Sequence, residues 1–208
     1  MSGRPRDGPQ HPFGLIVFDF DETIAHTDIG EYHLTDPIKH VFGGKVRKDK
    51  IEAMLQTVEE MGFATAVLSF NRSYIIEKAL QHLKHYFFEI LGWDNLEENS
   101  STEAPTKSNW IKQLMAACNI QDATTVCFCD DNNYNIEDVN KNLPDCHTIY
   151  IKRGRGMKDV HFEEVTTWVK IQVELSKLNT DNRKIVDAEK FFQVVEQEDV
   201  VEEDKYSP

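Results

Sequence analysis

The stretch LIVFDFDETI, residues 15–24, carries four apolar residues straight into Asp19 and Asp21, with Glu22 and Thr23 close behind. Carboxylates this close together repel one another unless a positive group lies between them. Carboxylate oxygens are also the ligands that hard cations such as Mg²⁺ prefer. The stretch therefore predicts a site that holds a metal ion, a transferring phosphoryl group, or both.

Polar residues follow other apolar runs in the same way. Ser69 and Asn71 lie at the end of FATAVLSF and just beyond it, and Asp130 and Asp131 follow TVCFC. Lys107 comes at the start of a predicted helix, after a polar loop. A lysine and helix N-termini supply positive charge for a phosphoryl group, one carboxylate can attack phosphorus, and a second can move protons.

The order of apolar runs and helical patterns predicts how these residues are positioned. Strands are predicted near residues 14–19, 63–70, 87–91, 125–129 and 147–151, and helices near 46–61, 73–85, 106–119, 136–143 and 160–178. Ser73 is expected to cap its helix, and residues 94–105 are expected to form a polar loop. Alternating strands and helices indicate an α/β fold, a three-layer Rossmann-like sandwich with a central parallel sheet of about five strands. In such sheets the site lies at the carboxyl ends of the strands.

In their order along the chain, these motifs resemble the four motifs of the haloacid dehalogenase superfamily. FDFDET resembles the first motif, VLSFN the second, Lys107 the third, and CDDNNYNIEDV the fourth. The resemblance covers roughly residues 13–160, and the later GRGM is most similar to the magnesium-dependent phosphatase branch. FDFDETI departs from the aromatic-rich segment of that branch and resembles a second branch, which acts on small phosphomonoesters.

The resemblance implies a role for each carboxylate. Asp19 would be the nucleophile and a Mg²⁺ ligand. Asp21 would be the general acid and base, with its backbone carbonyl also reaching the metal. Asp130 and Asp131 would complete the magnesium site, directly or through water. Because the dehalogenases of the superfamily lack the second aspartate, Asp21 implies phosphoryl transfer through an aspartyl phosphate.

Four further residues are substrate-binding candidates. By the resemblance, Ser69 would hydrogen-bond the phosphoryl oxygens and Lys107 would neutralise both nucleophile and phosphate. Thr23 and Asn71 are placed with them because they lie at the same two strand ends. The simpler alternatives are a plain turn residue for Ser69 and a solvated helix-start residue for Lys107, and the functional roles are favoured for both.

The segments between the predicted strands and helices are too short to form a large cap domain over the site. Residues 24–45 are long enough for a flap but too short for a separate domain. By analogy with the family, an open site suits a bulky substrate such as a phosphoprotein or a phosphorylated metabolite. A catalytically inactive binding protein and a phosphotransferase remain the alternative functions.

Three further features have open interpretations. Asn135 is equally a helix N-cap or a site residue, and the KRGRGM loop, residues 152–157, equally faces the site or solvent. His82 and His85 lie three residues apart on a predicted helix, but no carboxylate cluster joins them. Packing is therefore favoured over metal binding for this pair.

Composition limits the function classes. The net charge of −13 argues against a nucleic-acid or anionic-membrane binder. No run approaches the roughly 18 apolar residues of a membrane span. The first twelve residues lack the apolar core of a secretory signal, and the four cysteines show no metal-binding spacing, so buried thiols in a cytoplasmic or nuclear protein are expected.

The predicted domain organisation has three parts: a disordered arm over residues 1–12, a phosphatase domain over 13–180, and an acidic segment over 181–208. From residue 187 onward there are eight acidic and two basic residues. Apolar residues at near-helical spacing predict a helix that docks on the domain or on a protein partner, followed by disorder. They are Ile185, Ala188, Phe192 and Val195.

Overall fold

The computed structural model describes residues 12–98 and 106–178 and divides the chain into two units, residues 1–169 and 170–208. In the second unit, residues 170–178 are helical. The predicted acidic segment and all but the last residue of the predicted N-terminal arm lie outside the described residues. The expectations for both segments therefore stay predictions.

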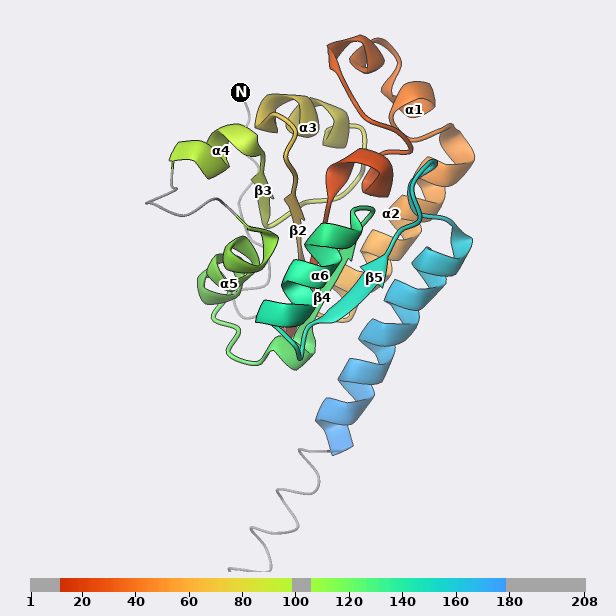
Figure 1. Ribbon diagram of the computed structural model, residues 1–208. Helices are drawn as coiled ribbons and strands as arrows, with labels where there is room; N and C mark the ends of the chain where they lie inside the picture. The colour runs from red at the N-terminus through yellow and green to blue at the C-terminus, as the bar shows by residue number, and fades with distance from the viewer. Residues whose placement is uncertain (1–11, 99–105, 179–208) are drawn as a thin grey trace, which may run out of the picture. The chain divides into compact units, whose positions relative to one another are not determined.

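A five-stranded parallel sheet, in the order β3-β2-β1-β4-β5, forms the centre of the first unit (Figure 1). The strands are β1 (Gly14–Phe18), β2 (Phe63–Leu68), β3 (Glu89–Leu91), β4 (Val126–Asp130) and β5 (His147–Tyr150). Every residue of β1, β2 and β4 is buried, as expected for strands covered on both faces. The predicted α/β fold with five parallel strands is confirmed.

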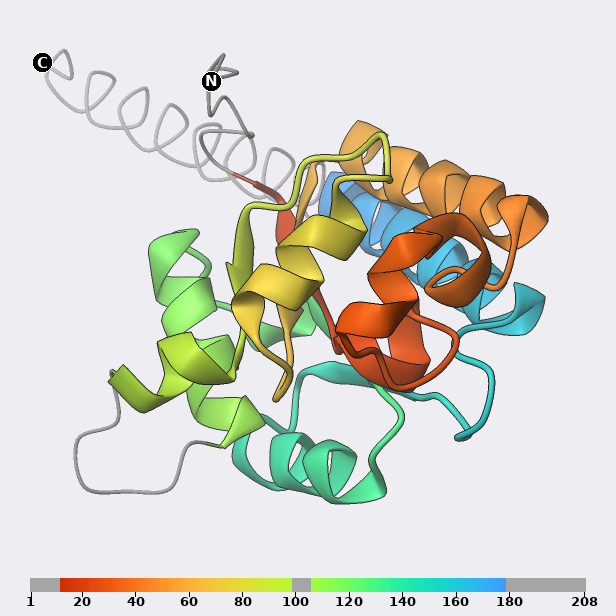
Figure 2. The ribbon, with the colours of Figure 1, turned by 90° about the horizontal axis from the view of Figure 1, so that it is seen from above.

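Helices cover both faces of this sheet (Figures 1 and 2). The longer ones are α2 (Lys45–Glu60), α3 (Ser73–Leu80), α4 (Trp93–Glu98), α5 (Lys107–Ala117) and α6 (Asn133–Asn142). Residues 159–169 are also helical and lie beside α2, where Lys50 pairs with Asp159 at 2.7 Å. Shorter turns are η1 (Phe20–Ile24), η2 (Glu31–Thr35), α1 (Pro37–His40) and η3 (Ala123–Thr125).

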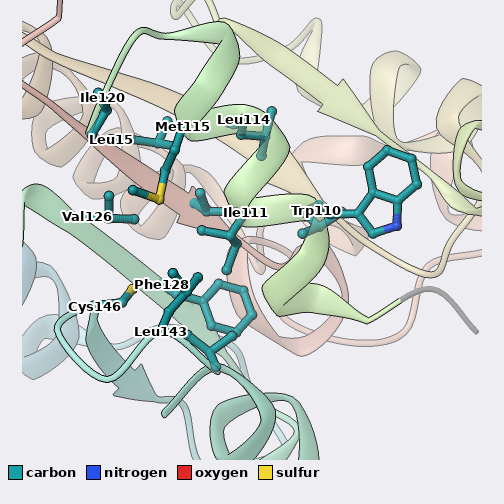
Figure 3. Close-up of a cluster of buried hydrophobic side chains, with 14 of the residues drawn as sticks. Leu15, Trp110, Ile111, Leu114, Met115, Ile120, Val126, Phe128, Leu143 and Cys146 are labelled. Carbon is teal, nitrogen blue, oxygen red and sulfur yellow. The ribbon is translucent and has the colours of Figure 1, made fainter. Parts of the chain in front are cut away.

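The apolar core on the α5 side of the sheet is continuous (Figure 3). Trp110, Ile111 and Leu114 of α5 belong to the same buried cluster as Leu15 of β1 and Phe128 of β4. This packing places the first turn of α5 against the central strands. The start of α5 is therefore held close to the carboxyl ends of β1 and β4.

Between β1 and β2 the described chain contains only η1, η2, α1 and α2, with no inserted cap domain. The absence of a large cap, as predicted, is confirmed for the part of the chain that the structure describes. Residues 24–45, for which a flap is predicted, contain η2 and α1 and reach the start of α2, and Figure 2 shows η2 and α1 beside α3. The four cysteines are buried and free. No helix in the described ranges is long and apolar enough to cross a membrane.

Two local predictions around α3 are wrong. Arg72, not Ser73, occupies the cap position, because Asp94 accepts hydrogen bonds from both the backbone N–H and the hydroxyl of Ser73. The helix ends at Leu80 rather than near His85, whose ring instead contacts the Thr65 hydroxyl at 2.7 Å. In both cases a distant residue supplies the hydrogen-bond partner.

The predicted polar loop over residues 94–105 is also wrong in its first part, because α4 begins at Trp93 and runs to Glu98. A glycine precedes this helix: Gly92 donates its backbone N–H to the Asn95 side chain at 3.0 Å. The polar composition of WDNLEE gave no sign of this helix, whose first turn contacts Ser73 of α3 and Phe70 and Asn71, which follow β2.

Candidate active site

Two adjacent central strands bring three aspartates together. Asp19 follows β1 directly, Asp130 is the last residue of β4, and Asp131 comes next in the chain. One carboxylate oxygen of each lies within 4.8 Å of the others, and all three residues are buried. The chain order reverses between β1 and β4, so the cluster occupies the place where open α/β sheets bind ligands.

Lys107, the first residue of α5, points into this cluster. Its Nζ lies 2.7 Å from Asp19 Oδ1 and 3.5 Å from Asp130 Oδ2, and it also donates to the backbone carbonyl of Leu68. Only 2% of the residue is exposed. A solvated helix-start lysine is therefore excluded, and the ammonium serves as the buried counter-charge of the nucleophile candidate.

The electrostatics of the cluster require more positive charge than Lys107 provides. Burial raises the pKa of Asp19 to about 8, although Lys107 opposes the rise. Burial and the neighbouring Asp130 raise the pKa of Asp131 to about 6. Burial alone would lower the pKa of Lys107, but Asp19 and Asp130 outweigh it and raise that pKa. Asp19 and Asp131, which lie near Lys107 and Arg153 respectively, therefore still favour their protonated forms more than exposed carboxyl groups do, and a further cation would oppose this.

This donor set fits a divalent cation. Three buried carboxylates present oxygen atoms at one point, and oxygen-only sites of this kind select hard ions such as Mg²⁺. The cluster unites Asp19, Asp130 and Asp131 of the predicted metal ligands. The Asp21 carboxylate is not part of it.

Asp21 lies in a separate group of polar side chains. Its carboxylate accepts hydrogen bonds from the backbone N–H of Ile29 at 2.7 Å and from Asn71 Nδ2 at 3.0 and 3.1 Å. Ser69 Oγ donates to it at 3.5 Å. Burial raises the pKa of Asp21 and these hydrogen bonds oppose the rise. The net direction favours the protonated form that a general acid requires.

The substrate-binding candidates Ser69 and Asn71 therefore adjoin Asp21. Besides Asp21, Asn71 Nδ2 donates to the Ile29 carbonyl at 2.8 Å, so its amide connects the flap to the second carboxylate. Thr23 is fully buried, and its hydroxyl has no hydrogen-bond partner among the described residues. Direct binding of a substrate by Ser69, Asn71 and Thr23 stays a prediction.

Asn135 belongs to the site rather than to the cap of α6. Asn132 is the cap residue, and its side chain accepts from the backbone N–H of Tyr134 at 3.0 Å. Asn135 Nδ2 instead donates to Asp130 Oδ2 at 2.9 Å, while the Asn132 backbone N–H donates to Asp130 Oδ1 at 2.7 Å. Both oxygens of Asp130 are thereby oriented.

The loop of residues 152–157 also faces the site. Arg153 Nε lies 3.0 Å from Asp131 Oδ2 and 3.9 Å from Glu22 Oε2. The other end of the loop is attached to the segment after β1, because Met157 donates its N–H to the Thr23 carbonyl at 2.9 Å. Of the two open interpretations of this loop, the structure supports the one that faces the site.

Two contributors have no clear sequence signal. Arg47 of α2 donates to the backbone carbonyls of Thr23, Ile24 and Met157 at 2.8–3.0 Å and so joins three segments around the site. The Phe70 ring centre lies 5.0 Å from Lys107 Nζ. Phe70 lies between the site candidates Ser69 and Asn71 in the chain, and this position is the feature of the sequence that indicates its contact with Lys107.

Comparison with known proteins gives matches at the level of structure. No family model and no curated protein matches the sequence. The N-terminal part of the protein BF1531 from Bacteroides fragilis, a phosphatase domain complexed with Mg, is similar with a TM-score of 0.53 at 15% identity. The match covers 77% of this chain and 40% of that chain, so this chain spans less than half of that protein's length.

Two further structures are similar with lower scores. The 3-deoxy-D-manno-octulosonate 8-phosphate phosphatase from Moraxella catarrhalis has 13% identity and a TM-score of 0.49, and the match covers 81% of this chain and 92% of that chain. The HAD domain of the effector protein Lem4 from Legionella pneumophila has 15% identity and a TM-score of 0.47, over 79% and 99% of the two chains. With its strand order, its capless topology and its aspartates at the switch point, the chain shares the fold of the Bacteroides fragilis phosphatase domain.

Proposed function

We propose that this protein is a Mg²⁺-dependent phosphatase that hydrolyses phosphomonoesters through an aspartyl phosphate on Asp19. The observation that carries the proposal is the separation of its carboxylates. Asp19 lies against the buried Lys107 ammonium in a three-carboxylate cluster, whereas Asp21 is held outside that cluster by Asn71 and Ile29. A nucleophile and a general acid need this difference in environment.

In the first step, an oxygen of Asp19 forms a bond to phosphorus while the bond between phosphorus and the leaving oxygen breaks. Asp21 gives its proton to the leaving oxygen. Lys107 neutralises charge on the nucleophile and the transferred group, and Ser69 donates a hydrogen bond to a phosphoryl oxygen. Mg²⁺, when bound by Asp19, Asp130 and Asp131, supplies further positive charge to the phosphoryl oxygens.

In the second step, Asp21 accepts a proton from a water molecule as that water attacks the phosphorus of the aspartyl phosphate. The phosphorus–oxygen bond to Asp19 breaks, inorganic phosphate leaves, and Asp19 is restored as a carboxylate. The same residue therefore acts first as an acid and then as a base. The raised pKa of Asp21 supports the first of these roles.

The open topology supports a bulky substrate, since no cap domain covers the site in the described residues. A phosphoprotein or a phosphorylated metabolite fits such a site. The similar Bacteroides fragilis phosphatase domain was solved with Mg, which supports Mg²⁺ as the metal. A protein partner for the acidic segment stays a prediction.

The test is hydrolysis of p-nitrophenyl phosphate by wild type and Asp19→Asn, each with Mg²⁺ and with chelator. Wild type with Mg²⁺ is expected to release phosphate. Asp19→Asn should lower kcat by at least about 10³-fold because it removes the nucleophile. Chelation should lower kcat by a similar factor because it removes the positive charge of the metal ion. Asp145→Asn, a matched change at an exposed position, is the control and should keep full activity.

Full activity of Asp19→Asn would contradict the assignment of the nucleophile. A wild type that binds Mg²⁺ but hydrolyses no phosphomonoester would favour the inactive binding protein. Adding acceptor alcohols and analysing products separates the phosphotransferase: a transferase yields the phosphorylated alcohol in place of inorganic phosphate.

A further inference from the structure

The loop between β5 and the helix at residue 159 is fixed against the segment that follows β1. Gly156 has φ +63°, and a Cβ there would lie 2.4 Å from the Ala25 carbonyl oxygen and 2.8 Å from that of Thr23. Met157 is bonded through its N–H to Thr23 and through its carbonyl to Arg47. Close backbone approach and these hydrogen bonds hold the loop beside the site.

Arg153 projects from this loop to the edge of the carboxylate cluster. Its Nε donates to Asp131 Oδ2 at 3.0 Å, which fixes the guanidinium next to a residue of the metal cluster. Glu22 is 3.9 Å from the same nitrogen, beyond hydrogen-bonding distance. The terminal nitrogens of Arg153 make no hydrogen bond to the described residues, and the Arg153 side chain is 67% exposed.

Arg153 contacts the cluster through Asp131, whose carboxylate lies within 4.8 Å of that of Asp19, so the guanidinium lies at the rim of the cluster. Lys107 already contacts Asp19 from within the core. The free N–H groups of Arg153 are therefore available to another part of the substrate. A guanidinium presents paired donors that match the two oxygens of a carboxylate or a phosphate.

We propose that Arg153 is a specificity residue that selects phosphomonoesters carrying a second anionic group, a carboxylate or a further phosphate, on the leaving group. Asp131 orients the guanidinium and leaves its outer edge for that group. This inference rests on the proposed function, because it concerns the same site and the same substrate class.

The test measures binding rather than turnover. Benzylphosphonate, whose carbon–phosphorus bond resists hydrolysis, is compared by calorimetry with its ortho-, meta- and para-carboxy derivatives and with a second series carrying a further phosphonate, all with Mg²⁺. At least one derivative with the second anionic group is expected to bind wild type about tenfold more tightly than benzylphosphonate. That size suits one charge-assisted pair at an exposed arginine.

Two arginines in the same loop provide a matched comparison. Arg153→Gln should abolish the preference and change the affinity for benzylphosphonate itself by less than about twofold. Arg153→Lys should keep only part of the preference, since it retains the charge but not the paired donors. Arg155→Gln removes the same charge from an exposed position and should leave the preference intact.

A set of isomers that all bind no better than benzylphosphonate would overturn the inference. So would a preference that survives Arg153→Gln. If Arg153→Gln weakened the binding of every phosphonate equally, the inference would also be overturned, because Arg153 would then act only as the counter-charge of Asp131. If benzylphosphonate itself does not bind in the presence of Mg²⁺, the proposed function fails, and this inference fails with it.

Discussion

Asp19 and Asp21 differ by two positions in the chain, yet their side chains have different partners. Asp19 is paired with a buried ammonium at 2.7 Å, whereas within the described ranges Asp21 accepts hydrogen bonds from neutral groups, Asn71 and Ile29 among them. An ammonium stabilises a carboxylate far more than amide donors do. These different environments support the proposed roles, with Asp19 as the nucleophile and Asp21 as the proton-transfer residue.

The contact between Asn71 and Asp21 predicts a leaving-group dependence. Asn71→Ala removes the donor that spans both carboxylate oxygens, so Asp21 should lose its orientation as an acid. We expect kcat to fall about 10²-fold for alkyl phosphates, whose leaving oxygen needs a proton. For p-nitrophenyl phosphate, whose leaving group is stable as an anion, the fall should be less than about threefold.

Steady-state kinetics on both substrates measures this difference, with Arg72→Ala as the neighbouring control. An equal loss on both substrates would show that Asn71 acts on binding or folding instead. The comparison needs no assumption about the physiological substrate.

At the scale of elements, the corner between β3 and α4 supports the Asp21 side of the site. Ser69 donates its backbone N–H to the Leu91 carbonyl at 2.9 Å, and Trp93 donates its N–H to the Asn71 carbonyl at 2.7 Å. Trp93 also packs edge-on against Phe70, with ring centres 5.9 Å apart. The short edge strand β3 and the six-residue helix α4 therefore position Ser69, Phe70 and Asn71, which follow the neighbouring strand β2.

Gly92 permits this close approach, and its replacement provides a test. A Cβ at this position would lie 2.3 Å from the Ser73 backbone nitrogen and 2.7 Å from the Asn71 carbonyl oxygen. Because backbone atoms cannot move aside as side chains do, Gly92→Ala should lower the free energy of unfolding by about 1–3 kcal/mol.

Urea unfolding measures the change, and Gly30→Ala is the matched control. A Cβ at Gly30 has no heavy atom within 4 Å, so this variant should be neutral or slightly more stable. Equal stabilities of the two variants would contradict the assigned role of the corner.

At the scale of the whole molecule, burial of ionisable groups connects stability to pH. The His85 side chain is 3% exposed, and burial lowers its pKa to about 4. Glu59 lies 3.5 Å away and would favour the charged form, but it is 62% exposed and its effect is screened by solvent. The folded protein therefore holds His85 neutral.

This burial predicts a loss of stability in mild acid. The unfolded chain binds a proton at His85 near pH 6.5, whereas the folded protein does so only near pH 4, so stability falls as pH decreases between these values. Between pH 7.5 and pH 5, protonation of His85 in the unfolded chain should lower the free energy of unfolding by about 2 kcal/mol.

Unfolding of wild type and His85→Gln at both pH values isolates this contribution, since all other groups are common to the two proteins. The free energy of unfolding of wild type should fall more steeply by that amount. Parallel pH dependences would show that His85 is not held neutral.

The sequence by itself determined the sheet and the order of the site residues. Continuous apolar runs such as LIVF and VCF, with helical periodicity between them, specify buried parallel strands because only a strand covered on both faces is apolar throughout. Strand ends in a parallel sheet meet at one edge, so the sequence predicts that Asp19 and Asp130 converge.

Only the tertiary structure decided which of these side chains touch. Asn135 contacts Asp130, although its local pattern fits a helix cap equally well. Arg153 contacts Asp131, although its pattern fits a solvated loop equally well. Arg47 contacts the backbone carbonyls of Thr23, Ile24 and Met157, although its pattern fits an exposed helix surface equally well. The early end of α3 and the start of α4 likewise depend on Thr65, Asp94 and Gly92. Local propensity carries no information about such distant partners, because they form only once the strands have set the distances between segments.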